Sequence, residues 1–188
     1  QLRGEKIASE LAASVVLGCG QFCTNPGLVI GIRSPAFSAF TASLVGLMAE
    51  QPAQTMLNRG TLASYAKGVQ ALREQPGIEH LAGGDQHGTQ AHPQLFKADV
   101  SLLLEGNPLL QEEVFGPATV LVEVADDAQL QQALRSFHGQ LTATLIAEAG
   151  DLQKHAGLLP LLEQKVGRVL FNGYPTGVEV CDAMVHGG

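Results

Sequence analysis

The sequence lacks any cluster of basic residues and any long apolar run. Its 11 lysine and arginine residues stand against 18 aspartate and glutamate residues, so the net charge is −7. Nucleic acid and anionic membrane surfaces, which attract basic patches, are therefore not expected as partners. No run approaches the ~20 apolar residues that span a bilayer. The first residues also lack the basic-then-apolar order of a signal peptide.

Cysteine is scarce, and no metal-binding pattern is present. The 3 cysteines are an odd number, and their spacing is not that of a disulfide-stapled small domain. Free thiols persist in a reducing compartment, so we expect a cytoplasmic protein. His87 and His92 lie five positions apart in a glycine-rich segment without a nearby partner. We therefore expect no metal site.

The length allows one domain. The chain has 188 residues, of which 45% are hydrophobic and 15% charged, enough for one folded core and too few for two comfortable domains. It starts without methionine and stops at His186–Gly188 in a loop-like stretch. We expect it to be a piece of a longer protein.

Helical and strand-like segments alternate along the sequence. Apolar residues recur at helical spacing in four segments, 5–17, 34–48, 61–74 and 126–137. Short apolar runs typical of buried strands occupy 28–32, 118–124, 141–147 and 169–171. Residues 78–93 are predicted to be loop-rich, 95–104 to hold one or two strands, and 109–117 to be irregular. A helical run capped by Asp151 is predicted to divide in two at Pro160. The alternation predicts an α/β fold, a mostly parallel sheet with helices on both faces.

A glycine-rich loop, Gly18–Gly27, holds two of the cysteines. It does not complete a dinucleotide fingerprint, because Cys23 stands where the third glycine belongs and no helix follows. Cys23 can be a buried core thiol, since free cysteine is among the most buried residue types. Its glycine-bracketed loop and small polar neighbours instead favour an exposed, reactive thiolate. Cys19, near the helix end, is expected to pack, and Cys181 is assigned no role.

The segment Gln111–Pro117, with the sequence QEEVFGP, is the second unusual stretch. Two adjacent acids precede a phenylalanine and a Gly-Pro turn. Alone, the segment fits a solvated turn that Phe115 anchors to the core. It also fits a carboxylate that binds sugar hydroxyls beside an aromatic ring that packs on a planar ligand.

Taken together, the two stretches resemble the aldehyde dehydrogenase superfamily. Gly20–Thr24 has the sequence GQFCT, and Glu112–Pro117, with EEVFGP, follows about ninety residues later. The segment Leu170–Val180, LFNGYPTGVEV, is similar to the branch that oxidises α-ketoglutaric semialdehyde (2,5-dioxopentanoate, or 2,5-dioxovalerate). The resemblance covers nearly the whole chain, so residues 1–188 are expected to be the catalytic domain of such an enzyme.

The resemblance implies a mechanism and three site residues. Cys23 would be the nucleophile, whose thiolate attacks the aldehyde to give a thiohemiacetal and then, after hydride transfer, a thioester that water hydrolyses. The backbone N–H of Cys23 would help stabilise the oxyanion. Glu113 would bind the nicotinamide ribose, and Phe115 would pack near the nicotinamide ring of NADP or NAD. The expected partners are a small-molecule aldehyde and, for the longer protein, further copies of itself in a homo-oligomer.

Other parts of the family's machinery are expected outside this sequence. They are the general-base glutamate and the oxyanion-hole amide, both upstream of Gln1, the dinucleotide-binding domain, and most of the C-terminal oligomerisation strand. The longer protein is therefore expected to be active and the 188 residues alone inactive. The alternatives are a long-chain aldehyde as substrate, a thioester-forming acyl transferase or coenzyme A-dependent branch, and a non-catalytic domain that kept the fold.

Overall fold

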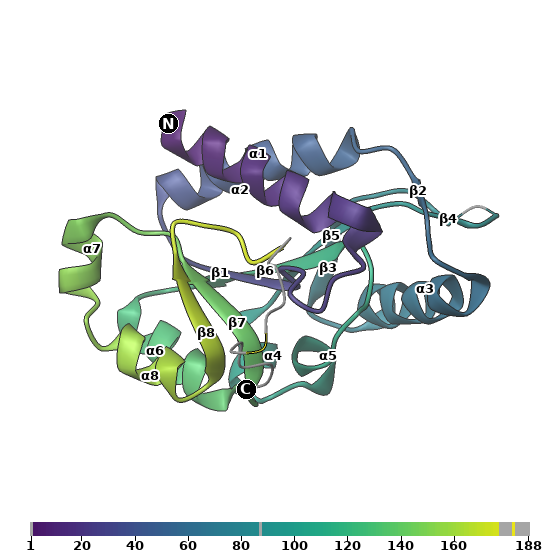
Figure 1. The fold of residues 1–188 in the computed structure, drawn as a ribbon. Helices are drawn as coiled ribbons and strands as arrows, with labels where there is room; N and C mark the ends of the chain where they lie inside the picture. The colour runs from purple at the N-terminus through teal and green to yellow at the C-terminus, as the bar shows by residue number, and fades with distance from the viewer. Residues whose placement is uncertain (1, 87, 177–181, 183–188) are drawn as a thin grey trace.

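A four-stranded sheet forms the central layer of the computed structural model, which describes residues 2–86, 88–176 and 182. The strands are β1 Leu28–Ile32, β3 Ile78–Ala82, β5 Gln94–Ala98 and β6 Ala118–Val124. Their order across the sheet is β1-β6-β5-β3 (Figure 1). β6 pairs in parallel with both β1 and β5, and β3 pairs antiparallel with β5. The predicted α/β fold with a mostly parallel sheet is confirmed.

Helices cover both faces of this sheet (Figure 1). They are α1 Leu2–Val16, α2 Pro35–Ala49, α3 Arg59–Glu74, α4 Val100–Leu104, α5 Pro108–Gln111 and α6 Asp127–Ser136. Leu121 of β6 packs in the core beneath α1 and α2, whereas Val120 and Val122 belong to the core beneath α3, α4 and α6. Successive strand residues point to opposite faces, so one strand supplies both cores.

The last third of the described chain forms a smaller unit beside the sheet. It contains the parallel strands β7 Gln140–Leu145 and β8 Val166–Phe171, and the helices α7 Ala149–Lys154 and α8 Leu158–Glu163. Leu134 of α6 packs against Leu158 and Leu162 of α8. His155 Nδ1 lies 2.6 Å from Asp127 Oδ1, and this hydrogen bond lowers the pKa of Asp127. The remaining strands, β2 Gln54–Thr55 and β4 Gln90–Ala91, form a short antiparallel pair.

The prediction for residues 78–104 was partly wrong. Residues 78–82, expected in a loop, form the edge strand β3, in which Ile78 lies opposite Ala98. Residues 95–104, expected to hold strands, form β5 and then the helix α4, which buries Leu103 completely. The cause is length, since a helix of 5 residues is too short for its periodicity to show in the sequence.

Two helix boundaries also differ from the prediction. Asp151 is not the cap of α7 but its third residue, and its carboxylate accepts a hydrogen bond from the backbone N–H of Glu148 at 3.0 Å. The break between α7 and α8 falls at residues 155–157, before Pro160. Pro160 lies in the first turn of α8, where its missing N–H has no intrahelical partner to lose.

Candidate active site

The loop with Cys23 and the turn with Phe115 each lead into a strand of the central sheet, β1 and β6 respectively. These strands are adjacent and parallel, with Leu28 opposite Val120. The backbone N–H of Val120 donates to the carbonyl of Gly27 at 3.0 Å, which fixes the register where both strands begin. Two stretches far apart in the sequence therefore lie together at the amino-terminal ends of β1 and β6.

The two stretches touch through their backbones. Gly20, at φ +63°, lies so close to the turn that a Cβ there would be 2.3 Å from the carbonyl carbon of Gly116 and 2.4 Å from the nitrogen of Pro117. Asn25 adds a side-chain bond, because its Nδ2 donates to the carbonyl oxygen of Gly116 at 3.0 Å. One contact lies before Cys23 and the other after it, so the cysteine loop is held against the turn at both sides.

The two described cysteines differ in environment. Cys19 is 2% exposed, its backbone N–H donates to Gln54 Oε1 at 3.0 Å, and its thiol donates to the Gln54 carbonyl at 3.5 Å. Burial raises the pKa of the Cys19 thiol. Cys23 is exposed. Because the thiolate is the reactive form and needs access, Cys23 rather than Cys19 suits a nucleophile among the two described cysteines.

Iodoacetamide near neutral pH is therefore expected to modify Cys23 first. Cys19 should react at least roughly tenfold more slowly, because it must be exposed by local opening before its thiolate can form. Peptide mapping by mass spectrometry after short reaction times measures both rates. In denaturant the two rates should become similar. Preferential modification of Cys19 in the folded protein would contradict the assignment.

The turn after Gln111 presents three of its side chains to solvent, those of Glu112, Glu113 and Phe115. Val114 packs against Gly68 of α3, where an added Cβ would lie 2.9 Å from it. The flanking residues Glu113 and Phe115 are exposed, the phenylalanine at 36%. Neighbouring chain still desolvates the Glu113 carboxyl and raises its pKa. Hydrogen-bond donors of a ligand would stabilise the charged form of such a carboxylate.

Tyr65 of α3 packs against this turn and hydrogen-bonds to it. The sequence did not identify Tyr65 as a site residue. Tyr65 is fully buried, and its hydroxyl donates to the carbonyls of His92 at 2.8 Å and Pro117 at 3.2 Å. A Cβ on Gly116 would lie 2.3 Å from the Tyr65 ring. A tyrosine on an apolar helix face could have indicated this role, since a buried tyrosine hydroxyl needs a hydrogen-bond partner. Asn25 was noted only as a small polar neighbour of the cysteine.

A third segment, the loop after β8, contacts the cysteine loop. The hydroxyl of Thr24, next to Cys23, donates to the carbonyl of Pro175 at 3.0 Å. The neighbouring Tyr174 donates to the carbonyl of Ile7 in α1 at 3.0 Å, and burial raises the pKa of Tyr174 to about 12. The start of the segment 170–180 is thus joined to the cysteine loop.

Some predictions fall on residues that the structure leaves undescribed. They concern His87, Cys181 and residues 177–180. Within the described ranges, no group of three or more histidine, cysteine or acidic residues could hold a metal ion. Among the same residues, no helix combines the length and apolarity needed to cross a membrane.

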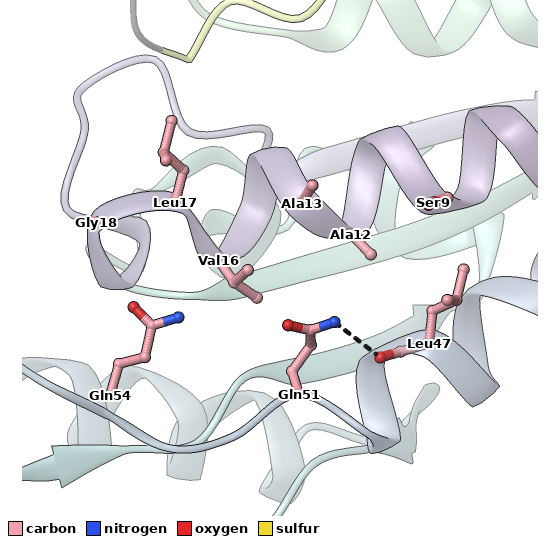
Figure 2. A pocket seen from close by; sticks show the side chains of 9 residues that line it. All are labelled: Ser9, Ala12, Ala13, Val16, Leu17, Gly18, Leu47, Gln51 and Gln54. Atoms are coloured by element: carbon pink, nitrogen blue, oxygen red, sulfur yellow. Dashed lines mark hydrogen bonds between the residues drawn. The ribbon is translucent and has the colours of Figure 1, made fainter.

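A pocket of about 430 Å³ lies between α1 and the connection from α2 to β2. It borders the start of the cysteine loop at Gly18, but Cys23 and Phe115 do not line it. Figure 2 shows the amide of Gln51 pointing toward Ala12 and Val16 of α1, and the amide of Gln54 pointing toward the turn at Gly18. Both amides are engaged, since Gln51 donates to the Leu47 carbonyl at 3.3 Å and Gln54 accepts from the backbone of the loop. The pocket walls carry no charged group, and the Ser9 hydroxyl has no acid or base beside it in the lining. We therefore assign no catalytic role to this pocket.

Comparisons with known proteins place the chain in context. No family model matches the sequence. Over 188 residues it is 54% identical to alpha-ketoglutaric semialdehyde dehydrogenase of Acinetobacter baylyi and 44% identical to alpha-ketoglutaric semialdehyde dehydrogenase 2 of Azospirillum brasilense. Each alignment covers 99% of this chain and 36% of the relative, so the chain spans about a third of these proteins.

Solved structures with the same fold were also found. A 1-pyrroline-5-carboxylate dehydrogenase of Thermus thermophilus superposes with a TM-score of 0.77 at 17% identity, over 98% of this chain and 36% of that chain. An NAD-dependent benzaldehyde dehydrogenase of Corynebacterium glutamicum superposes with a TM-score of 0.72 at 19% identity, over 90% of this chain and 37% of that chain. At such identities the likeness concerns the fold alone.

Proposed function

The chain belongs to the aldehyde dehydrogenase superfamily, and we propose that it is the catalytic domain of an enzyme that oxidises an aldehyde to the carboxylic acid with NAD or NADP. The observation that carries this proposal is the exposed Cys23 on a loop bonded, through Asn25, to the turn of Glu113 and Phe115. The 54% identity to an alpha-ketoglutaric semialdehyde dehydrogenase supports α-ketoglutaric semialdehyde as the substrate.

The exposed side chains of the turn fit a nicotinamide nucleotide. Because Val114 is directed against α3, Glu113 and Phe115 on either side of it remain available to a ligand. The carboxylate of Glu113 would accept hydrogen bonds from ribose hydroxyls, and the ring of Phe115 would pack on the planar nicotinamide. The cofactor, when bound, supplies a hydride acceptor, and these residues orient it.

Cys23 carries out the bond changes in this proposal. Its thiolate forms an S–C bond to the carbonyl carbon, and the carbonyl oxygen becomes an alkoxide that the backbone N–H of Cys23 stabilises. When the C=O bond re-forms, the C–H bond breaks with its electron pair leaving as hydride, and a thioester remains on Cys23. Water then adds to the thioester carbon and the C–S bond breaks, which releases the acid and restores the thiolate.

Water needs a general base, which we place outside these 188 residues together with the dinucleotide-binding domain. Base assistance is typically worth ~10²–10⁴-fold in rate. The longer protein would carry the complete site and assemble as a homo-oligomer.

The test is NAD(P)H formation by the full-length enzyme with α-ketoglutaric semialdehyde, a long-chain aldehyde, and each substrate with coenzyme A added. We expect the semialdehyde to give the highest kcat/KM, with the free acid as product. The isolated 188 residues should form no NAD(P)H. Absence of NAD(P)H from the full-length enzyme with every aldehyde would overturn the proposed function. Activity of the isolated residues would refute our placement of the base and the cofactor domain.

A further inference from the structure

The carbonyl oxygen of Gly116 accepts two hydrogen bonds of different kinds. One comes from the backbone N–H of Ala118 at 2.8 Å and belongs to the turn itself. The other comes from Asn25 Nδ2 at 3.0 Å and crosses from the cysteine loop. Gly116 directly follows Phe115, and Asn25 lies two residues after Cys23. The bond between Asn25 and Gly116 therefore connects two positions that are close in sequence to the proposed nucleophile and to the proposed cofactor-binding residue.

The turn keeps its shape without Asn25. The Pro117 carbonyl accepts from Tyr65 at 3.2 Å and from the backbone N–H of Gln94 at 2.8 Å. The Tyr65 ring lies directly against Gly116. Both contacts come from elements other than the cysteine loop, so removing the Asn25 bond leaves the turn anchored.

The cysteine loop also has anchors of its own. Thr24 donates to the Pro175 carbonyl at 3.0 Å, and Gln21 Oε1 accepts from the backbone N–H of Leu57 at 2.9 Å. Within the loop, the backbone N–H of Asn25 donates to the Phe22 carbonyl at 3.0 Å. The internal shape of this loop therefore does not depend on the bond to Gly116 either.

The orientation of the Asn25 amide is fixed by its partner. Its Oδ1 is buried and has no hydrogen-bond partner among the described residues. Turning the amide over would place Oδ1 against the Gly116 oxygen, which sets two acceptors face to face. An amide that leaves one buried atom unsatisfied, while both segments are anchored elsewhere, serves the connection between them rather than either segment alone.

We propose that Asn25 is a positioning residue that sets the separation between the Cys23 sulfur and a nicotinamide ring packed on Phe115. The inference rests on the proposed function. The backbone of Gly20 lies against Gly116 before Cys23, and the Asn25 bond holds the loop after Cys23. Hydride transfer requires this alignment, because the C–H bond of the cysteine-bound substrate must point at its acceptor. A shift of about 1 Å in such an alignment can cost on the order of 10²-fold in rate.

The test compares Asn25→Leu with Thr24→Val in the full-length enzyme. Asn25→Leu keeps the approximate size of the side chain and removes the donor to Gly116 without placing a charge near Cys23. We expect kcat to fall about 10- to 100-fold, with the KM for the aldehyde changed less than about threefold. The primary isotope effect on kcat with aldehyde deuterated at C1 should rise, because hydride transfer becomes slower than the other steps. The rate of Cys23 alkylation without cofactor should stay within about twofold of wild type.

Thr24→Val is the matched control, because it removes a hydrogen bond from the same loop without touching the Gly116 turn. Equal losses of kcat in both variants would overturn the inference, since they would show general loosening of the loop. Wild-type kcat in Asn25→Leu, or a fall in cofactor-free alkylation that matches the fall in kcat, would also overturn it. A wild-type enzyme that forms no NAD(P)H overturns the proposed function, whereas these outcomes in an active enzyme overturn only the role of Asn25.

Discussion

Replacing Cys23 with alanine is expected to abolish aldehyde oxidation by the full-length enzyme. Without the S–C bond the aldehyde carbon never becomes a tetrahedral alkoxide, and hydride loss from the free aldehyde is far harder. Removal of a nucleophile from a comparable covalent mechanism costs on the order of 10⁶-fold in kcat. The measurement is NAD(P)H formation at saturating substrate, beside calorimetric titration of the cofactor, which should still bind because Glu113 and Phe115 are unchanged.

Cys19→Ala is the control for this prediction. It also deletes a thiol from the glycine-rich loop, but one that is buried and donates only a weak hydrogen bond to Gln54. Its kcat should stay within about threefold of wild type, because free buried cysteine behaves as a small hydrophobe. A large loss in Cys19→Ala together with an active Cys23→Ala would move the nucleophile. Unchanged function of the longer protein in both variants would favour a non-catalytic domain.

The elements that the sequence predicted well are those whose signals are local. Ser34 accepts from the backbone N–H of Phe37 at 3.1 Å as the cap of α2, with Pro35 at its first position, as the Ser-Pro pair indicated. The strand β6 has the predicted bounds 118–124, because five of its seven residues are apolar and it is buried on both faces. The strand β3 was missed because its sequence, IEHLA, has no apolar run, and pairing with β5 rather than composition makes it a strand.

In the site, too, local features could be predicted from the sequence, whereas contacts between distant segments could not. The exposure of Cys23 followed from its glycine-bracketed loop, a local feature. That this loop meets the turn of Phe115 was expected only through the family resemblance. Nothing in the spacing of the two stretches indicates it, because it depends on β1 and β6 being parallel neighbours. Ligand sites of open α/β sheets usually lie at the carboxyl ends of the strands, and here both motifs precede their strands.

Because the two motifs lie so close together, the methyl group that Gly20→Ala adds is expected to lower the stability of the fold strongly. At φ +63° alanine costs roughly 1–2 kcal/mol relative to glycine, because its Cβ approaches its own carbonyl. The new Cβ would also lie 2.3–2.4 Å from three backbone atoms of Gly116 and Pro117, which cannot rotate away as a side chain can. We expect a total loss of about 2–5 kcal/mol in the free energy of unfolding, since overpacking typically adds about 1–3 kcal/mol. For a chain of this size that lowers Tm by about 4–20 °C.

Gly46→Ala in α2 is the matched control, since an added Cβ there meets nothing within 4 Å. In a helix interior this change should raise the stability by roughly 0.5–1 kcal/mol. Thermal unfolding of both variants therefore gives shifts of opposite sign for the same chemical change. A Gly20→Ala variant that keeps its Tm would show that the cysteine loop does not lie against the Gly116 turn. If stability falls and kcat falls further than the unfolded fraction explains, the same methyl group has moved Cys23 away from Phe115, because the backbone contact that keeps the two motifs together has been forced apart.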